Sequence, residues 1–130
     1  MIGFNVRTQI DSRQVLAKVR RANIANLGHA GAAIRLTARR SIRKRQQPST
    51  PGQPPHTREG LLRQAILFSV ERPQQRVVIG PSAALVGTSG KAHEFGGRYR
   101  RENYPRRPFM APALAKLRPR LPRFWADSIR

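Results

Sequence analysis

Short groups of residues in the second half of the chain are where chemistry would be expected first. Gly87-Thr-Ser-Gly-Lys91 resembles the end of a loop that binds nucleotide phosphates. Such a loop needs another glycine five residues before its Gly-Lys pair, and a serine or threonine after the pair to ligand magnesium. Position 85 is leucine and position 92 is alanine. The segment therefore does not predict nucleotide binding.

Histidines and acids do not form a catalytic or metal-binding pattern either. His93-Glu94 is not followed by a second histidine at the zinc-protease spacing, because position 97 is glycine. His29 and His56 stand in unrelated contexts, and no serine lies in a Gly-x-Ser-x-Gly frame. With 6 acids in the whole chain, an acid–base carboxylate pair has few candidates. We expect a non-enzyme without metal or cofactor, in which Glu94 pairs with an arginine.

Net charge is the strongest compositional signal. The 130 residues carry 26 Lys plus Arg against 6 Asp plus Glu, a formal charge of +20. This excess favours a polyanionic partner, either nucleic acid or an acidic protein surface. The codon bias of a GC-rich genome would also enrich arginine. The basic residues are spread along the chain, so no detached basic tail accounts for them.

Length and composition predict one domain over residues 1–130, with a modest core that self-association would help to complete. The chain has no cysteine, so it offers neither a disulfide framework nor a thiolate metal site. No apolar run approaches the roughly 18 residues that span a bilayer, and the first residues lack a signal-peptide layout. We expect no membrane contact and a location in the cytosol, or in a particle assembled there.

One long amphipathic helix is predicted from Ser12 to Arg45, with Asp11 or Ser12 as its cap. Apolar or small residues recur at three- and four-residue steps, as in a single buried stripe. The stripe consists of Leu16, Val19, Leu27, Ala30, Ile34, Ala38 and Ile42. Gly28 and Gly31 indicate a bend, a close helix contact or, alternatively, a break into two helices. The cations at its end are stabilised by the negative end of the helix dipole. This basic run is either a solvated face or a contact with DNA or an acidic ring.

Residues 46–60 are predicted to form an extended Pro-rich arm, because Pro48, Pro51, Pro54 and Pro55 are incompatible with a helix or a central strand. A connection of this length is unusual inside a compact domain. Polyproline-like stiffness would let it reach a neighbouring subunit at little entropic cost. An inter-subunit strap is favoured over a simple linker.

A small antiparallel sheet of about four strands is predicted next, after a helical turn at 61–65. Its strands would be 66–71, 77–79, 83–86 and 93–95, and Gly96-Gly97 would form a turn with positive φ. Residues 98–104 are predicted to be a mobile basic loop. A helix from Ala111 to Leu117 follows, Pro119 and Pro122 interrupt the chain after it, and Phe124, Trp125 and Ile129 form a last apolar cluster. The predicted fold class is α+β.

Two stretches of this sequence resemble the small neck proteins of long-tailed double-stranded DNA bacteriophages. Pro51–Ile66 reads PGxPPxxRxGxLxxxI, and His93-Glu-Phe-Gly-Gly97 is followed by RPFxxPAL at Arg107–Leu114. The resemblance implies an α+β subunit with a long N-terminal helix, a curved antiparallel sheet and a further helix. It also implies a homo-oligomeric ring, expected to be hexameric, in the neck of the virion. Its partners would be adjacent neck, portal-side or tail-tube proteins, with double-stranded DNA in the lumen.

Candidate contact residues follow from these interpretations. The candidates for contact with DNA or for lining the lumen are Arg39, Arg40, Arg43, Lys44, Arg45, Arg98, Arg100 and Arg101. The resemblance implies inter-subunit contacts through extended loops and hairpins, with Pro51, Pro54, Pro55, Arg58, Phe95, Arg107, Pro108 and Phe109 as candidates. Six copies of a +20 chain carry about +120 charges, whereas a ring roughly 40 Å tall encloses about 24 phosphates of duplex DNA. We therefore expect only a subset of the arginines to face DNA.

Two other functions remain open from the sequence. A stand-alone nucleic-acid-binding protein would explain the charge, but the chain shows no aromatic stacking signature, zinc knuckle or helix-turn-helix pattern. An assembly factor that is absent from the mature particle would show the same motifs. The exact station in the neck, whether connector, stopper, tail completion or tail terminator, is not set by the motifs.

Overall fold

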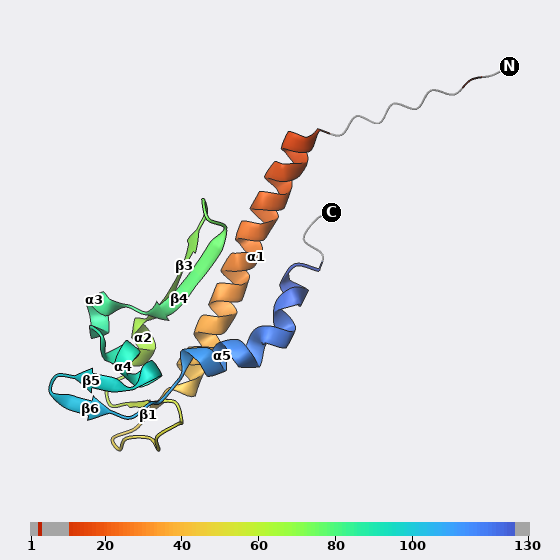
Figure 1. Ribbon diagram of the computed structural model, residues 1–130. Coiled ribbons are helices and arrows are strands. Elements are labelled where there is room, and N and C mark those ends of the chain that lie inside the picture. The colour runs from red at the N-terminus through yellow and green to blue at the C-terminus, as the bar shows by residue number, and fades with distance from the viewer. Residues whose placement is uncertain (1–2, 4–10, 127–130) are drawn as a thin grey trace.

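The long helix α1 (Ser12–Ser41) is the axis around which the other elements are arranged (Figure 1). The computed structural model describes residue 3 and residues 11–126. The predicted α+β class is confirmed, with a long N-terminal helix, small antiparallel sheets and a C-terminal helix. Asp11 caps α1 by accepting hydrogen bonds from the backbone N–H groups of Arg13 and Gln14. The predicted cap and start of the helix are therefore confirmed.

The end of α1 differs from the prediction. The helix stops at Ser41, and Ile42 turns into extended backbone and becomes buried, with 1% of its surface exposed. Strand β1 (Arg43–Lys44) then pairs in parallel with β2 (His56–Thr57). The N–H of Arg45 donates to the carbonyl of Thr57 at 2.9 Å. Pairing with the Pro-rich segment thus replaces the last helical turn that the sequence predicted.

The hairpin of β3 (Ile66–Glu71) and β4 (Arg76–Pro81) lies along one side of α1. A Cβ on Gly31 would lie 2.7 Å from Val77 Cγ2 and 2.8 Å from Phe68 Cδ2. Gly31 therefore marks a close helix contact, one of the predicted alternatives, and α1 is not broken there. Two residues of the predicted stripe, Leu16 and Val19, lie outside this contact and are 57% and 37% exposed.

Two predicted strands are wrong. Residues 83–86 form helix α3 (Ala83–Val86), and 93–95 end helix α4 (Ser89–Phe95). Short apolar runs suit a buried helix as well as a strand. The predicted loop 98–104 is a second hairpin, β5 (Gly97–Tyr99) with β6 (Glu102–Tyr104), so the antiparallel strands form two hairpins instead of one sheet. Gly96 and Gly97 do have positive φ, at 73° and 136°, as predicted.

The C-terminal part returns along α1 on the side opposite the β3–β4 hairpin (Figure 1). Helix α5 (Met110–Leu117) confirms the predicted helix, and a 3-10 helix (Arg118–Phe124) runs through Pro119 and Pro122 instead of being interrupted there. Trp125 Nε1 donates to Asn23 Oδ1 at 2.9 Å, and Asn23 Nδ2 donates to Gln75 Oε1 at 2.9 Å. Asn23 thus ties both flanking elements to α1, whereas Ile129 lies outside the described residues.

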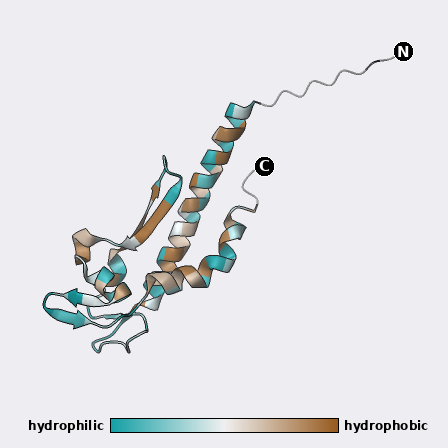
Figure 2. Cartoon of the chain, in the orientation of Figure 1, coloured by the Kyte–Doolittle hydropathy of each residue, from teal (hydrophilic) through white to brown (hydrophobic). Residues whose placement is uncertain are grey.

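The core lies where α1, α5 and the short helix α2 (Leu61–Ala65) meet. Its members include Phe109, Ile66 and Ala65, each 0% exposed. Figure 2 shows apolar residues on β3, β4, α1 and α5, while the β5–β6 hairpin and the Pro-rich segment are hydrophilic. The core therefore leaves one end of the molecule with a polar surface, and most of the predicted contact residues lie there.

Candidate nucleic-acid interface and the junction behind it

A buried carboxylate joins the two C-terminal motif segments. Glu94, on α4, is 7% exposed. Its Oε2 accepts hydrogen bonds from the backbone N–H of Phe109 at 2.8 Å and of Met110 at 2.9 Å, and its Oε1 accepts from Ala111 at 3.0 Å. These are the free N–H groups at the start of α5, where a negative charge also suits the helix dipole. Glu94 therefore caps α5. The prediction that Glu94 pairs with an arginine is wrong.

The Pro-rich segment closes onto the same junction. The N–H of Gly52 donates to the carbonyl of Arg106 at 2.8 Å, and Arg107 Nε donates to the carbonyl of Ser49 at 2.9 Å. The N–H of Arg107 donates to the carbonyl of His93 at 2.7 Å. Hydrogen bonds at Ser49 and Gly52 thus fasten the Pro-rich segment to its own chain, and its contact with a neighbouring subunit stays a prediction. All three motif segments meet in one place.

The structure distributes the predicted inter-subunit residues between interior and surface. Phe109 and Pro55 are among the largest fully buried side chains, so they hold this chain together. Arg107, Pro108 and Pro54 are half-buried. The exposed candidates are Pro51, Arg58 and Phe95. Composition alone does not separate these groups, because a Pro-rich motif that packs inward reads like one that reaches outward.

The basic run at the end of α1 has both structural and free members. Arg39 is half-buried and donates to the carbonyl of Gln64 at 3.0 Å, while Arg35 Nε donates to the carbonyl of Ile66 at 3.0 Å. Burial, and then the nearby charges of Arg35 and Arg63, lower the pKa of Arg39. Both arginines thus hydrogen-bond carbonyls at the end of α2, a role that the sequence analysis missed.

The other cations of the run are exposed around β1. Arg40, Arg43, Lys44 and Arg45 all reach solvent. Arg40 and Arg43 line a hollow of about 430 Å³ together with residues of the Pro-rich segment. A neighbouring hollow of about 420 Å³ is lined by Arg45, Arg58 and Arg107, among others. We call the exposed cations Arg40, Arg43, Lys44, Arg45 and Arg58 the basic end.

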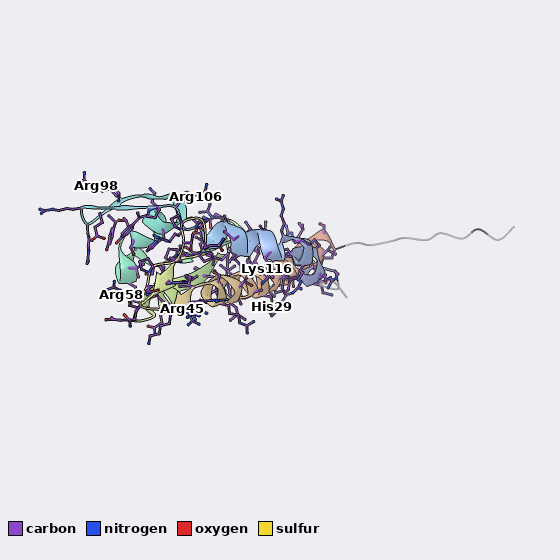
Figure 3. All side chains as sticks on the ribbon, turned by 90° about the horizontal axis from the view of Figure 1, so that it is seen from below. His29, Arg45, Arg58, Arg98, Arg106 and Lys116 are labelled. Atoms are coloured by element: carbon purple, nitrogen blue, oxygen red, sulfur yellow. The ribbon has the colours of Figure 1, made fainter. Side chains whose placement is uncertain are left out.

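The second predicted DNA-contact group lies on the β5–β6 hairpin. Arg98 is exposed, and Arg100 and Arg101 form the turn with φ of 48° and 66°. Left-handed backbone favours glycine or asparagine, so two arginines there cost local stability. Arg100 lies with its guanidinium 5.3 Å from the centre of the Tyr99 ring. Figure 3 shows Arg98 and Arg106 on one side of this end of the molecule, with Arg45 and Arg58 on the other.

Few acids oppose these cations. Within residues 3 and 11–126 the structure has one side-chain ion pair, between Glu71 and Arg76, away from the basic end. Glu94 is consumed by the cap of α5. Glu102 lines one hollow with Arg45 and Arg58, and Glu59 lines another with Lys44, but among the described residues neither acid forms an ion pair with these cations. A phosphate backbone that approached this end would therefore meet guanidinium groups that are open to bidentate contacts.

His93 lies beneath this surface. Its ring stacks on Tyr104, with centroids 5.0 Å apart and an interplanar angle of 5°. Burial, and then the charge of Arg107, lower the pKa of His93. Its Nδ1 is buried without a hydrogen-bond partner among the described residues. A neutral, stacked histidine in this position supports packing of the hairpin on α4.

The described chain brings together no group of three or more His, Asp or Glu side chains that could hold a metal ion. Over the same residues, no helix is both long and apolar enough to cross a membrane. No family model, curated protein or solved structure matches the chain. The structure itself shows a basic surface beside the junction that Glu94 and the Pro-rich segment form.

Proposed function

We propose that this chain is a structural subunit of a bacteriophage neck. Copies of it would form a ring that joins the DNA-filled head to the tail and lets double-stranded DNA pass through the lumen. The ring would work in the virion, after assembly in the host cytoplasm. It would contact adjacent neck, portal-side or tail-tube proteins, and it would not act as an enzyme.

The observation that carries the proposal is the junction at Glu94. The three segments on which the resemblance to neck proteins rests are far apart in the sequence, yet all are used to build one joint. A joint made of a carboxylate cap, a buried proline and backbone hydrogen bonds positions surfaces and performs no reaction. Motifs used in this way suit a structural part.

The surfaces that this joint holds in place also suit a structural subunit. Exposed cations at the basic end can contact phosphates, and their net effect does not depend on base sequence. Large apolar side chains remain exposed elsewhere, among them Leu16 at 57% and Phe95 at 69%. Exposed apolar side chains of this size are consistent with a subunit that completes its burial in an assembly.

Disruption of the gene in the phage that encodes the chain tests the proposal. We expect filled heads and finished tails that remain separate, and joined particles again when the gene is supplied in trans. Electron microscopy of purified particles should place the chain between portal and tail tube. Normal joined particles without the chain would refute the proposal.

A stand-alone nucleic-acid-binding protein is the second candidate, favoured by the exposed cations of the basic end, none of which forms an ion pair within the described residues. It predicts that the chain is recovered with intracellular DNA or RNA and is missing from particles. An assembly factor would also be missing from particles, but its loss would leave heads and tails unjoined. The disruption and the particle images together separate the three functions.

A further inference from the structure

The first turns of α1 carry apolar side chains that the described part of the chain leaves bare. Val15, Leu16 and Val19 are 48%, 57% and 37% exposed. With about 3.6 residues per turn, they lie on the same helix face as Asn26 and Ala30, which are buried. The helix extends beyond the tip of the β3–β4 hairpin, so the face that forms the core lower down continues uncovered (Figure 1). We call Val15, Leu16 and Val19 the helix knob.

A mostly apolar hollow lies toward the other end of the molecule. It has a volume of about 460 Å³ and opens between the end of β4, α3, α4 and the start of α5. Ile79, Pro81, Ala83 and Met110 contribute apolar atoms to its lining. Phe95 belongs to the same lining and, at 69%, is the most exposed large apolar side chain of residues 11–126. We call this feature the Phe95 hollow.

Charge separates this hollow from the basic ones. Lys91 is its one lining cation, and its one acid, Glu94, is already engaged with α5. The hollows at the basic end have two or three arginines each. A second copy of a +20 chain therefore meets less repulsion at the Phe95 hollow than at the basic end, whereas a nucleic acid would prefer the basic end.

We propose that the helix knob of one copy docks in the Phe95 hollow of the next copy. The helix knob and the Phe95 hollow are different surfaces and lie toward opposite ends of the folded molecule. The contact is therefore heterologous and generates a ring or a filament. A second copy also satisfies both surfaces with one type of contact, whereas an unrelated partner would cover one of them. The inference rests on the proposed neck function for its biological setting, and it names the contact that would join the subunits.

Cysteine cross-linking tests the contact directly, because the chain has no cysteine of its own. A Leu16→Cys chain is mixed with an Ala83→Cys chain and treated with a short thiol-reactive bifunctional reagent, at about 0.5 M salt to screen repulsion. The matched control replaces Leu16→Cys by Leu36→Cys, which is on the same helix and 47% exposed. We expect at least tenfold more linked product from the Leu16 pair. Equal yields, or no linked product, would overturn the proposal.

Charge substitutions give a second readout by sedimentation of the full chain. Leu16→Asp and Phe95→Asp should each weaken self-association at least tenfold, whereas Leu36→Asp should leave it unchanged or strengthen it by lowering the net charge. Weakening by all three variants equally, or by none, would refute the contact. These measurements in solution are independent of particle imaging. A ring in the neck without selective linking would reject this contact alone, and selective linking by a chain missing from particles would reject the neck function alone.

Discussion

Glu94 shows how a single side chain can hold together segments that are distant in the sequence. Its carboxylate accepts three backbone hydrogen bonds at the start of α5. In Glu94→Ala these N–H groups lose their partners beside the buried Phe109, and we expect unfolding to become easier by roughly 3 kcal/mol. Urea unfolding followed by circular dichroism measures the change. Glu94→Gln, which keeps the shape and one oxygen, should lose less.

A second acid provides the control for charge. Glu59→Gln removes one negative charge at an exposed position. It should change the free energy of unfolding by less than about 0.5 kcal/mol. If Glu94→Ala were as mild as Glu59→Gln, the cap of α5 would not be what joins the motif segments.

His93 gives the fold a pH dependence of known sign. Burial and the charge of Arg107 lower the pKa of His93 in the folded chain, so the unfolded chain takes up the proton more readily. The free energy of unfolding should therefore fall as pH drops through about 6.5, the ordinary value for histidine. His93→Phe keeps a ring to stack on Tyr104 but cannot titrate, so it should remove this part of the slope. Urea unfolding at about pH 7.5 and about pH 5.5 measures how much the free energy of unfolding changes with pH in each protein. An equal change in the original chain and in His93→Phe would contradict this role of His93.

At the scale of elements, the packing of α1 on the β3–β4 hairpin depends on a missing side chain. Gly31→Ala would place a methyl group within 3 Å of Val77 and Phe68, so these side chains or the hairpin that carries them must shift. We expect the variant to lose roughly 1–3 kcal/mol of stability despite the better helix propensity of alanine.

Gly28 is the matched comparison, one helical turn earlier. A Cβ there meets nothing within 4 Å. Gly28→Ala should therefore stabilise the chain by up to about 1 kcal/mol through helix propensity alone. Thermal unfolding measures the shift in unfolding temperature that each of the two variants causes. Equal shifts in the same direction would mean that the hairpin does not press on the helix at Gly31.

The elements that the sequence predicted well are those with a long or self-contained signal. The capped amphipathic start of α1, the two strands predicted at 66–71 and 77–79, and the helix predicted at 111–117 each carry their own pattern. Helix α3 and the end of α4 were predicted as strands because the apolar runs 83–86 and 93–95 are too short to display a period. The end of α1 was missed because the bonds that replace it come from residues 56–57, a partner that local patterns do not reveal.

The candidate site was predictable to a similar degree. Motif spacing located the segments that meet at the junction, and the basic run at the end of α1 located four of the five cations of the basic end. Sequence did not reveal that Phe109 and Pro55 are buried, or that Arg39 bonds a carbonyl of α2. Each of these depends on contacts between residues that are distant in the chain.

At the scale of the whole molecule, the charge is divided between arginines with structural partners and arginines left in solvent. Arg35, Arg39 and Arg107 donate to backbone carbonyls, while the cations of the basic end are exposed. The exposed group has all of its guanidinium or ammonium donors available to replace counterions on a phosphate backbone. A uniform coat of charge would make every exposed arginine equivalent for DNA, whereas a defined interface would not.

Salt-dependent binding to duplex DNA distinguishes these two cases. Each phosphate contact contributes about −0.9 to the slope of log K against log salt concentration. Replacing Arg43, Lys44 and Arg45 by glutamine should therefore make the slope shallower by up to about 2.7 if all three side chains contact phosphates. The same replacement at Arg118, Arg120 and Arg123 removes equal charge from exposed positions on the 3-10 helix. Those changes should alter the slope far less, because the residues lie outside the basic end. Equal changes in both triple variants would show that DNA responds to net charge alone and that the basic end is not an interface.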